Sequence, residues 1–245
     1  MPDAVPQIVS TPLNEGQRIV DTFVAPTKTF TDVLRSAAWW GPLIVMIVVS
    51  IAFSFSVQTK VGWGTVMENN VRQSPKQAER FAQMPPDQLA TAKAVGAKFT
   101  AVIAYCFPVL ILIFNAITVL LVWATVNFGF AGTAKYGQVF AVYMYAGLVF
   151  NLKFILAVIA LFAGVAPDSF LLNNPVGTNL GYFLVGTDLP HILVSYATHI
   201  DVFEIWSLIL SVIGVGIVAK VARGKAAAAV VGWWIILVLI SGAFS

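Results

Sequence analysis

The sequence predicts an all-α, polytopic membrane protein with five transmembrane helices, a cytoplasmic N-terminus and a C-terminus outside. Hydrophobic residues make up 59% of the 245-residue chain and charged residues only 10%, whereas ordinary soluble domains carry roughly 25% charged residues. These few charges cannot cover a surface that faces water. The remaining apolar surface must therefore face lipid.

Five apolar stretches set the number of spans. A helix needs about 20 mainly apolar residues to cross the roughly 30 Å hydrocarbon core, and five runs meet or approach that length. The runs are too continuously apolar for barrel strands, which would alternate, so helices are expected. This divides the chain into an N-terminal segment, residues 1–38, and a membrane domain, residues 39–245. The spans are expected at about 39–57, 102–128, 139–163, 203–221 and 226–244.

The orientation follows from the basic residues near the span ends. The 164–202 loop contains no Lys or Arg, which is typical of the outer side. The 58–101 loop then also lies outside; it is an exception with six Lys or Arg, which three acids partly balance. The other basic residues fall on the inner side, together with the N-terminus: Arg18, Lys28, Arg35, Lys135, Lys220, Arg223 and Lys225.

The N-terminal segment contains a predicted amphipathic helix. Pro26 suits the first turn of a helix, and Phe30, Val33 and Leu34 then recur at helical spacing. A helix with one apolar face and a charged remainder is expected to lie at the inner membrane interface; a frayed tail is the alternative.

The two long loops differ in character. In the 58–101 loop, Pro85, Pro86 and Asp87 predict the start of a helix that continues into the second span and projects beyond the membrane. The 164–202 loop is too apolar for a flexible loop. It is expected to pack over the outer ends of the spans or to dip into the membrane interface.

A search for catalytic and ligand-binding motifs finds none. Walker, HExxH and GxSxG motifs are absent, and Cys106 is the only cysteine. His191 and His199 alone are a poor metal site and are expected to form interfacial hydrogen bonds. The scattered basic residues do not make a nucleic-acid surface. We therefore predict no catalytic residues, no metal site, no cofactor and no nucleic-acid partner, and we expect that the protein is not an enzyme.

Lys153 is the residue of the predicted spans whose burial in the membrane costs the most free energy. It lies near the middle of the third span, where a charge costs at least roughly 2.5–3.5 kcal/mol. The nearest acids that could pair with it are Asp201 and Glu204, and Asn151 is expected to form an interhelical hydrogen bond. Two interpretations remain open: a buried or snorkelling amine that fixes helix packing, or part of a path for an ion or substrate.

Four sequence features resemble those of a known family. They are Phe23-x-x-Pro26-Thr27-x-Thr29-Phe30 followed by Trp39-Trp40-Gly41-Pro42; Lys135-Tyr136-Gly137-Gln138 leading to Tyr143-x-Tyr145-Ala146; Asp201-Val202-Phe203-x-x-Trp206-Ser207-Leu208-x-Leu210 ending in Gly214; and the five spans with a cytoplasmic N-terminus. Over residues 20–245 the chain resembles the bacterial branch of the Yip-one domain family, the Ypt/Rab-interacting multipass membrane proteins. The motif residues are Pro26, Phe30, Tyr143, Tyr145, Asp201, Phe203, Trp206 and Gly214.

The resemblance also has departures. The proline that often follows the Tyr-Ala pair of bacterial members is missing from Gly147 to Phe150. The acidic and tyrosine motifs of the eukaryotic branch are not evident, which argues against direct binding of a GTPase.

The resemblance implies an all-helical, non-catalytic protein. The family is linked in eukaryotes to vesicle trafficking and membrane organisation. We expect this chain to be a membrane scaffold or adaptor in membrane organisation or trafficking, located in a bacterial inner membrane. The expected partners are membrane lipids and either other membrane proteins or a cytoplasmic protein at the N-terminal segment; a homo-oligomer is a further possibility. The alternative is a small transporter or lipid-handling channel with a polar path at Lys153, Asp201 and Glu204.

Overall fold

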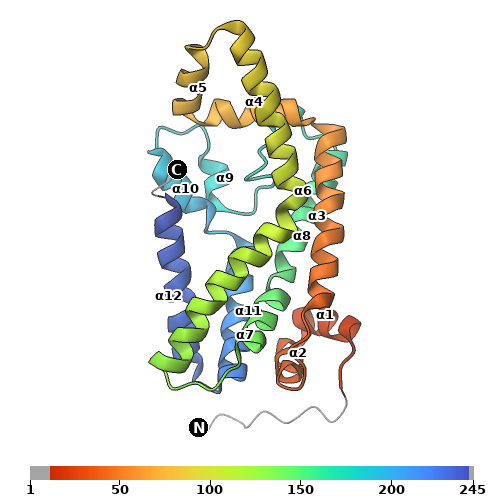
Figure 1. The fold of residues 1–245 in the computed structure, drawn as a ribbon, viewed down its shortest axis with the longest axis vertical. Helices are drawn as coiled ribbons and strands as arrows, with labels where there is room; N and C mark the ends of the chain where they lie inside the picture. Colours follow the sequence, from red (N-terminus) through yellow and green to blue (C-terminus); the bar gives the residue numbers. More distant parts are fainter. Residues whose placement is uncertain (1–11, 243–245) are drawn as a thin grey trace. The chain divides into compact units, whose positions relative to one another are not determined.

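The fold was obtained as a computed structural model, which describes residues 12–242 (Figure 1). Within that range the chain forms helices and no strand, apart from an isolated bridge between Asn179 and Asp201. Five helical segments are long and apolar enough to cross a membrane, which confirms the predicted all-α, five-span class. They are α3 (Trp40–Lys60), α6 with the π turn that follows it (Pro86–Gly129), α7 and α8 together (Tyr136–Phe162), α11 (Val202–Ala219) and α12 (Arg223–Gly242).

The chain divides into two compact units. The first comprises Met1–Met46, Ile111–Phe150 and Thr178–Ser245, and the second Ile47–Leu110 and Asn151–Gly177. Besides parts of the spans, the described residues of the first unit form four shorter helices: α1 (Glu15–Val24), α2 (Pro26–Val33), α9 (Leu180–Leu184) and α10 (His191–Thr198). Residues 1–11, part of the predicted N-terminal segment, and residues 243–245, at the end of the predicted fifth span, lie outside the described range.

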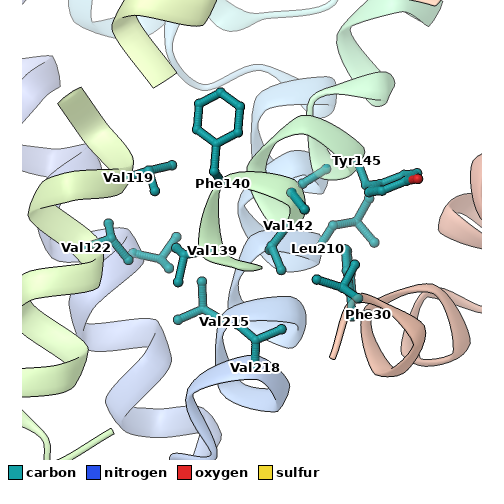
Figure 2. Packing of buried hydrophobic residues seen from close by; sticks show 14 of the residues in the cluster. Phe30, Val119, Val122, Val139, Phe140, Val142, Tyr145, Leu210, Val215 and Val218 are labelled. Atoms are coloured by element: carbon teal, nitrogen blue, oxygen red, sulfur yellow. The ribbon is translucent and has the colours of Figure 1, made fainter. Parts of the chain in front are cut away.

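The core of the first unit forms where α2, α7 and α11 pack together with the end of α6. Figure 2 shows Phe30 of α2 facing Val142 of α7 and Leu210 of α11. The predicted helix that starts at Pro26 is present as α2. Phe30 and Val33 of its predicted apolar face are fully buried. The apolar face of α2 therefore packs against protein.

The second unit has its own small core. Helix α4 (Trp63–Gln73) packs on the 3₁₀ turn Pro167–Ser169. The Asn69 side-chain amide donates to the carbonyl oxygens of Pro167 and Phe170, both at 2.8 Å. The unit also contains α5 (Pro75–Ala82) and the main part of α8 (Leu148–Phe162). Its buried apolar residues are Phe53, Val57, Val61, Val66, Ala157, Leu161 and Phe170.

Helix α6 confirms the predicted helix start at the proline pair. It runs from Pro86 to Ala124, 39 residues, which is roughly 60 Å at 1.5 Å per residue and about twice the thickness of the hydrocarbon core. Asp87 lies in its first turn, where the helix dipole favours a carboxylate.

The third predicted span is interrupted, which the apolar pattern does not reveal. Helix α7 (Tyr136–Ala146) ends before Gly147, and α8 begins at Leu148. The Gly147 amide bonds to the Tyr143 carbonyl at 2.9 Å. A Cβ atom at Gly147 would lie 3.1 Å from that same oxygen, so a larger residue there would crowd the turn. The 164–202 loop also differs from a simple loop, because it contains α9 and α10.

Candidate functional site

The best-defined polar site in the first unit lies where α1 and α2 meet α7 and α11. We call it the N-terminal junction. It combines a chain of charged side chains with an apolar contact, and its members are Glu15, Arg18, Phe23, Phe30, Asp32, Arg35, Tyr145, Trp206 and Gly214.

Local sequence signals form the hairpin of α1 and α2. Asn14 and Gln17 make a reciprocal capping box at the start of α1, with bonds of 2.8 and 3.0 Å. Pro26 occupies the first turn of α2. The Thr22 and Thr29 hydroxyls both donate to the Arg18 carbonyl oxygen, at 2.7 and 3.0 Å. The Thr22 bond lies within α1, whereas the Thr29 bond joins α2 to α1.

A buried ion pair joins the two helices. The Arg18 Nε atom donates to Asp32 Oδ2 at 2.7 Å, and the two side chains are only 1% and 2% exposed. Arg35 donates to both carboxylate oxygens, at 2.9 and 3.0 Å. Burial alone would raise the pKa of the Asp32 carboxyl, but the hydrogen bonds from Arg35 and Arg18 outweigh it and hold the pKa below its usual value. Asp32 is therefore ionised at neutral pH.

Tyr145 extends this chain to α7. Its hydroxyl donates to Glu15 Oε2 at 2.6 Å, across 130 positions of sequence, and Glu15 Oε1 lies 3.5 Å from Arg18 Nη1. The Tyr145 side chain is fully buried. A Cβ atom at Gly41 would lie 2.6 Å from Glu15 Oε2, so a larger residue there would displace the carboxylate from its present position. The charged chain thus attaches the hairpin to a membrane-spanning helix.

The apolar half of the junction depends on Gly214. A Cβ atom there would overlap Val142 of α7 and lie 3.1 Å from the Phe30 ring. The missing side chain therefore lets α2 and α7 approach α11 closely. The Phe23 and Trp206 rings meet in a T-shaped arrangement, with ring centroids 5.9 Å apart. Both aromatic side chains of the hairpin therefore contact or closely approach α11.

Adding a methyl group at Gly214 is expected to destabilise the fold. We expect Gly214→Ala to lower the free energy of unfolding by about 1–3 kcal/mol, because the core around it has no room. Gly216→Ala is the matched control: its Cβ would lie 3.6 Å or more from its neighbours, so it is expected to be neutral or mildly stabilising. Thermal unfolding in detergent compares the two variants, and equal melting temperatures would contradict the packing role of Gly214.

The structure brings several predicted motif residues together. Pro26, Phe30, Tyr145, Trp206 and Gly214 all belong to the helices of the junction, and Tyr143 and Phe203 pack against the same core. The Glu15–Arg18–Asp32 chain was not predicted from the sequence. The only local signal was opposite charges within two helical segments, and that pattern is too common to single out a pair.

Asp201 serves as the N-cap of α11. Its Oδ1 atom accepts the Phe203 amide at 2.8 Å and the Glu204 amide at 3.3 Å, and Oδ2 accepts the Thr178 hydroxyl at 2.7 Å. An aspartate at an N-cap satisfies amides that have no partner within the helix. Asp201 thus starts the helix that carries Trp206 and Gly214.

Glu204 belongs to a second polar cluster, which joins α10, α11 and α12. It accepts the Trp234 indole N–H at 2.5 Å, and its carboxylate lies 3.1 Å from His199 Nδ1. His199 Nε2 lies 3.3 Å from the Ser241 hydroxyl oxygen. A hydrogen bond at His199 was predicted from the sequence. Both nitrogens of its imidazole ring lie within hydrogen-bonding distance of a polar side chain.

The order Ser241–His199–Glu204 is also that of the residues in a serine hydrolase triad. Ser241 donates to the Val238 carbonyl at 2.8 Å, however, and the amides of α12 are used in the hydrogen bonds of the helix itself. An oxyanion needs N–H donors aimed at the reacting atom. The contacts of the cluster link the end of α10 to α11 and α12.

Lys153 and Asn151 belong to the second unit, whereas Asp201 and Glu204 belong to the first. Asn151 is buried and Lys153 half-buried. Pairing between Lys153 and these acids stays a prediction. Among residues 12–242 no group of three or more His, Cys, Asp or Glu side chains could hold a metal ion; the His191 side chain lies outside the described part.

Comparison with known proteins identifies a family. The family model described as Yip1 domain matches residues 20–244, the range in which all the motif residues of the junction lie. No curated protein and no solved structure matched the chain. Because the matched range covers most of the chain, this multipass membrane protein belongs to the Yip1 domain family.

Proposed function

We propose that the protein is a non-enzymatic scaffold or adaptor of a bacterial inner membrane, and that the hairpin of α1 and α2 is its docking surface. The observation that supports this most directly is the buried Arg18–Asp32 ion pair, with side chains 1% and 2% exposed. A docking surface binds more tightly when it is held in shape before the partner arrives. The ion pair and the Tyr145–Glu15 bond fix the hairpin in this way.

The solvent-exposed face of the α1–α2 hairpin has a small apolar centre. Val20 and Val24 lie one turn apart on α1 and are 60% and 74% exposed. Gln17 and Lys28, both exposed, are polar neighbours in the hairpin sequence. An apolar centre with a polar surround is the usual composition of a protein contact. With the N-terminus inside, this face would be open to a cytoplasmic protein or to the inner part of another membrane protein.

The acids of the alternative polar path already have partners within their own unit. Asp201 caps α11 and accepts from Thr178, and Glu204 accepts from Trp234 and contacts His199. Both carboxylates therefore take part in contacts between helices, and this supports the scaffold over a small transporter or lipid-handling channel.

Crosslinking in native membranes followed by pull-down tests the docking surface. Deleting residues 1–35 would also remove the buried Phe30 and Arg18, so point changes on the exposed face are sharper. We expect Val20→Ser with Val24→Ser to lose a defined subset of the crosslinked partners at unchanged protein level. A second copy of the chain with a different tag reports whether self-association is among the lost contacts.

The matched control is Val95→Ser, since Val95 of α6 is equally exposed, at 61%, but lies outside the hairpin. It is expected to keep the full partner set. If the double variant also keeps every partner, the hairpin is not the docking surface.

A further inference from the structure

We infer that α9 and α10 form a hairpin that is embedded in one leaflet of the membrane, on the side where α12 ends. Its outer face would contact lipid at the boundary between headgroups and acyl chains. This inference is independent of the proposed scaffold role, because it concerns a different part of the first unit.

The surface of this hairpin is apolar. Its short helices and their flanking turns expose large apolar side chains, of which Phe183 is the most exposed at 69%. The others in the segment 178–200 are Leu180, Tyr182, Val185, Leu189, Ile192, Leu193 and Ile200. Eight such side chains in one short segment exceed what a water-facing surface normally carries.

The segment has almost no charge to offset this surface. Between Thr178 and Ile200 the only formally charged side chain is that of Asp188, and there is no Lys or Arg. A surface of this composition would associate or precipitate in water. It therefore needs an apolar environment.

Continuity with α12 identifies lipid as that environment. Helix α10 packs against α12: the Tyr196 hydroxyl donates to the Leu239 carbonyl at 3.4 Å, and Gly242 lies against the Tyr196 ring. The neighbouring face of α12 exposes Ile235, Ile236, Leu239 and Ile240. That helix is a membrane span, so its exposed apolar residues meet acyl chains. The apolar surface of α10 therefore continues the lipid-facing surface of α12 at the end of that helix.

The lengths of the two helices restrict them to one leaflet. They contain 5 and 8 residues, or roughly 8 and 12 Å at 1.5 Å per residue, against a core of about 30 Å. They pack closely on each other, since Gly181 leaves room for Thr198 and the Val194 carbonyl. A hairpin of this size can enter the membrane and leave it again on the same side.

The polar groups of the hairpin suit a position at the interface. The Asn179 side chain accepts the Tyr182 amide at 2.9 Å and caps α9. The Thr187 hydroxyl donates to the Leu184 carbonyl at 2.7 Å. Gly186, with a φ of 80°, allows the turn that carries Asp188. A turn with these groups can meet headgroups and water, while the side chains of both helices face the acyl region.

Spin labelling in lipid vesicles tests the inference. Cys106 is the only cysteine, so Cys106→Ser gives a background in which single cysteines can be labelled. Phe183→Cys reports the hairpin face, Leu239→Cys the lipid-facing surface of α12, and Asp188→Cys the polar turn. We expect the labels at Phe183 and Leu239 to be several-fold more accessible to oxygen than to a water-soluble nickel complex, and the label at Asp188 to show the reverse.

Two results would overturn the inference. If the label at Phe183 is as accessible to the nickel complex as that at Asp188, the face meets water. If it is shielded from both reagents, protein covers it; loss of spin–spin broadening on dilution with unlabelled protein would then identify a second copy. All three positions are exposed, so the labels are not expected to disturb folding, and size-exclusion chromatography checks this.

Discussion

Replacing Asp32 by asparagine is expected to lower the free energy of unfolding by about 3–5 kcal/mol, the usual cost of removing one partner from a buried ion pair. The change leaves the Arg18 guanidinium buried at 1% exposure with only the more distant Glu15 carboxylate, at 3.5 Å, to balance its charge. Thermal or denaturant unfolding of the purified protein in detergent measures the loss.

Arg35→Gln is the matched control for this prediction. Arg35 bonds to the same carboxylate at 2.9 Å, but its side chain is 49% exposed, so solvent screens the interaction and the loss should be much smaller. A double variant, Arg18→Met with Asp32→Leu, should recover much of the stability, because an apolar pair of similar volume needs no charge compensation. Equal losses for Asp32→Asn and Arg35→Gln would contradict the buried ion pair.

The same pair makes stability depend on pH in the acid range. The pKa of Asp32 in the folded protein lies below its ordinary value of 3.8, because the hydrogen bonds from Arg35 and Arg18 outweigh the effect of burial. The contribution is therefore fully present above pH 3.8 and is lost as the pH falls through the lower pKa of the folded state. In Asp32→Asn this part of the pH dependence should be missing.

Truncating Phe30 to alanine is expected to cost about 3–5 kcal/mol, as for other fully buried phenylalanines. Phe30 has no exposed surface, and its ring fills the space that Gly214 leaves on α11. The cavity cannot easily close, since the ion pair and the Tyr145–Glu15 bond hold the hairpin in place. The melting temperature in detergent should fall accordingly.

Val24→Ala provides the comparison for Phe30→Ala within the same hairpin. Val24 is 74% exposed, so its truncation should change stability by no more than about 0.5 kcal/mol. If the two variants unfold at the same temperature, Phe30 does not contribute to the core as described.

The five spans could be predicted because apolar length is a strong local signal. The break of the third span at Gly147 could not, since an isolated glycine is common within transmembrane helices. Helices α9 and α10 were also missed. They have 5 and 8 residues within a segment rich in glycine and proline, too short for a periodic pattern to stand out.

The candidate site was predictable only in part. The family resemblance identified Phe30, Tyr145 and Gly214, and the structure places all three at the junction. The Tyr145–Glu15 bond joins positions 130 residues apart, which no local pattern reveals. The contacts of Glu204 with His199, five positions away, and with Trp234 of α12 were not predicted either.

The N-terminal junction has a consequence for biosynthesis. The ribosome releases α1 and α2 first, but Tyr145 and Gly214, which hold them in place, are made much later. Contacts so distant in sequence form slowly and only after their last participant has been made. Until α11 is inserted, Phe30 and the Arg18–Asp32 pair remain outside a completed core. A chain that stops before α11 would therefore leave the hairpin without these core contacts.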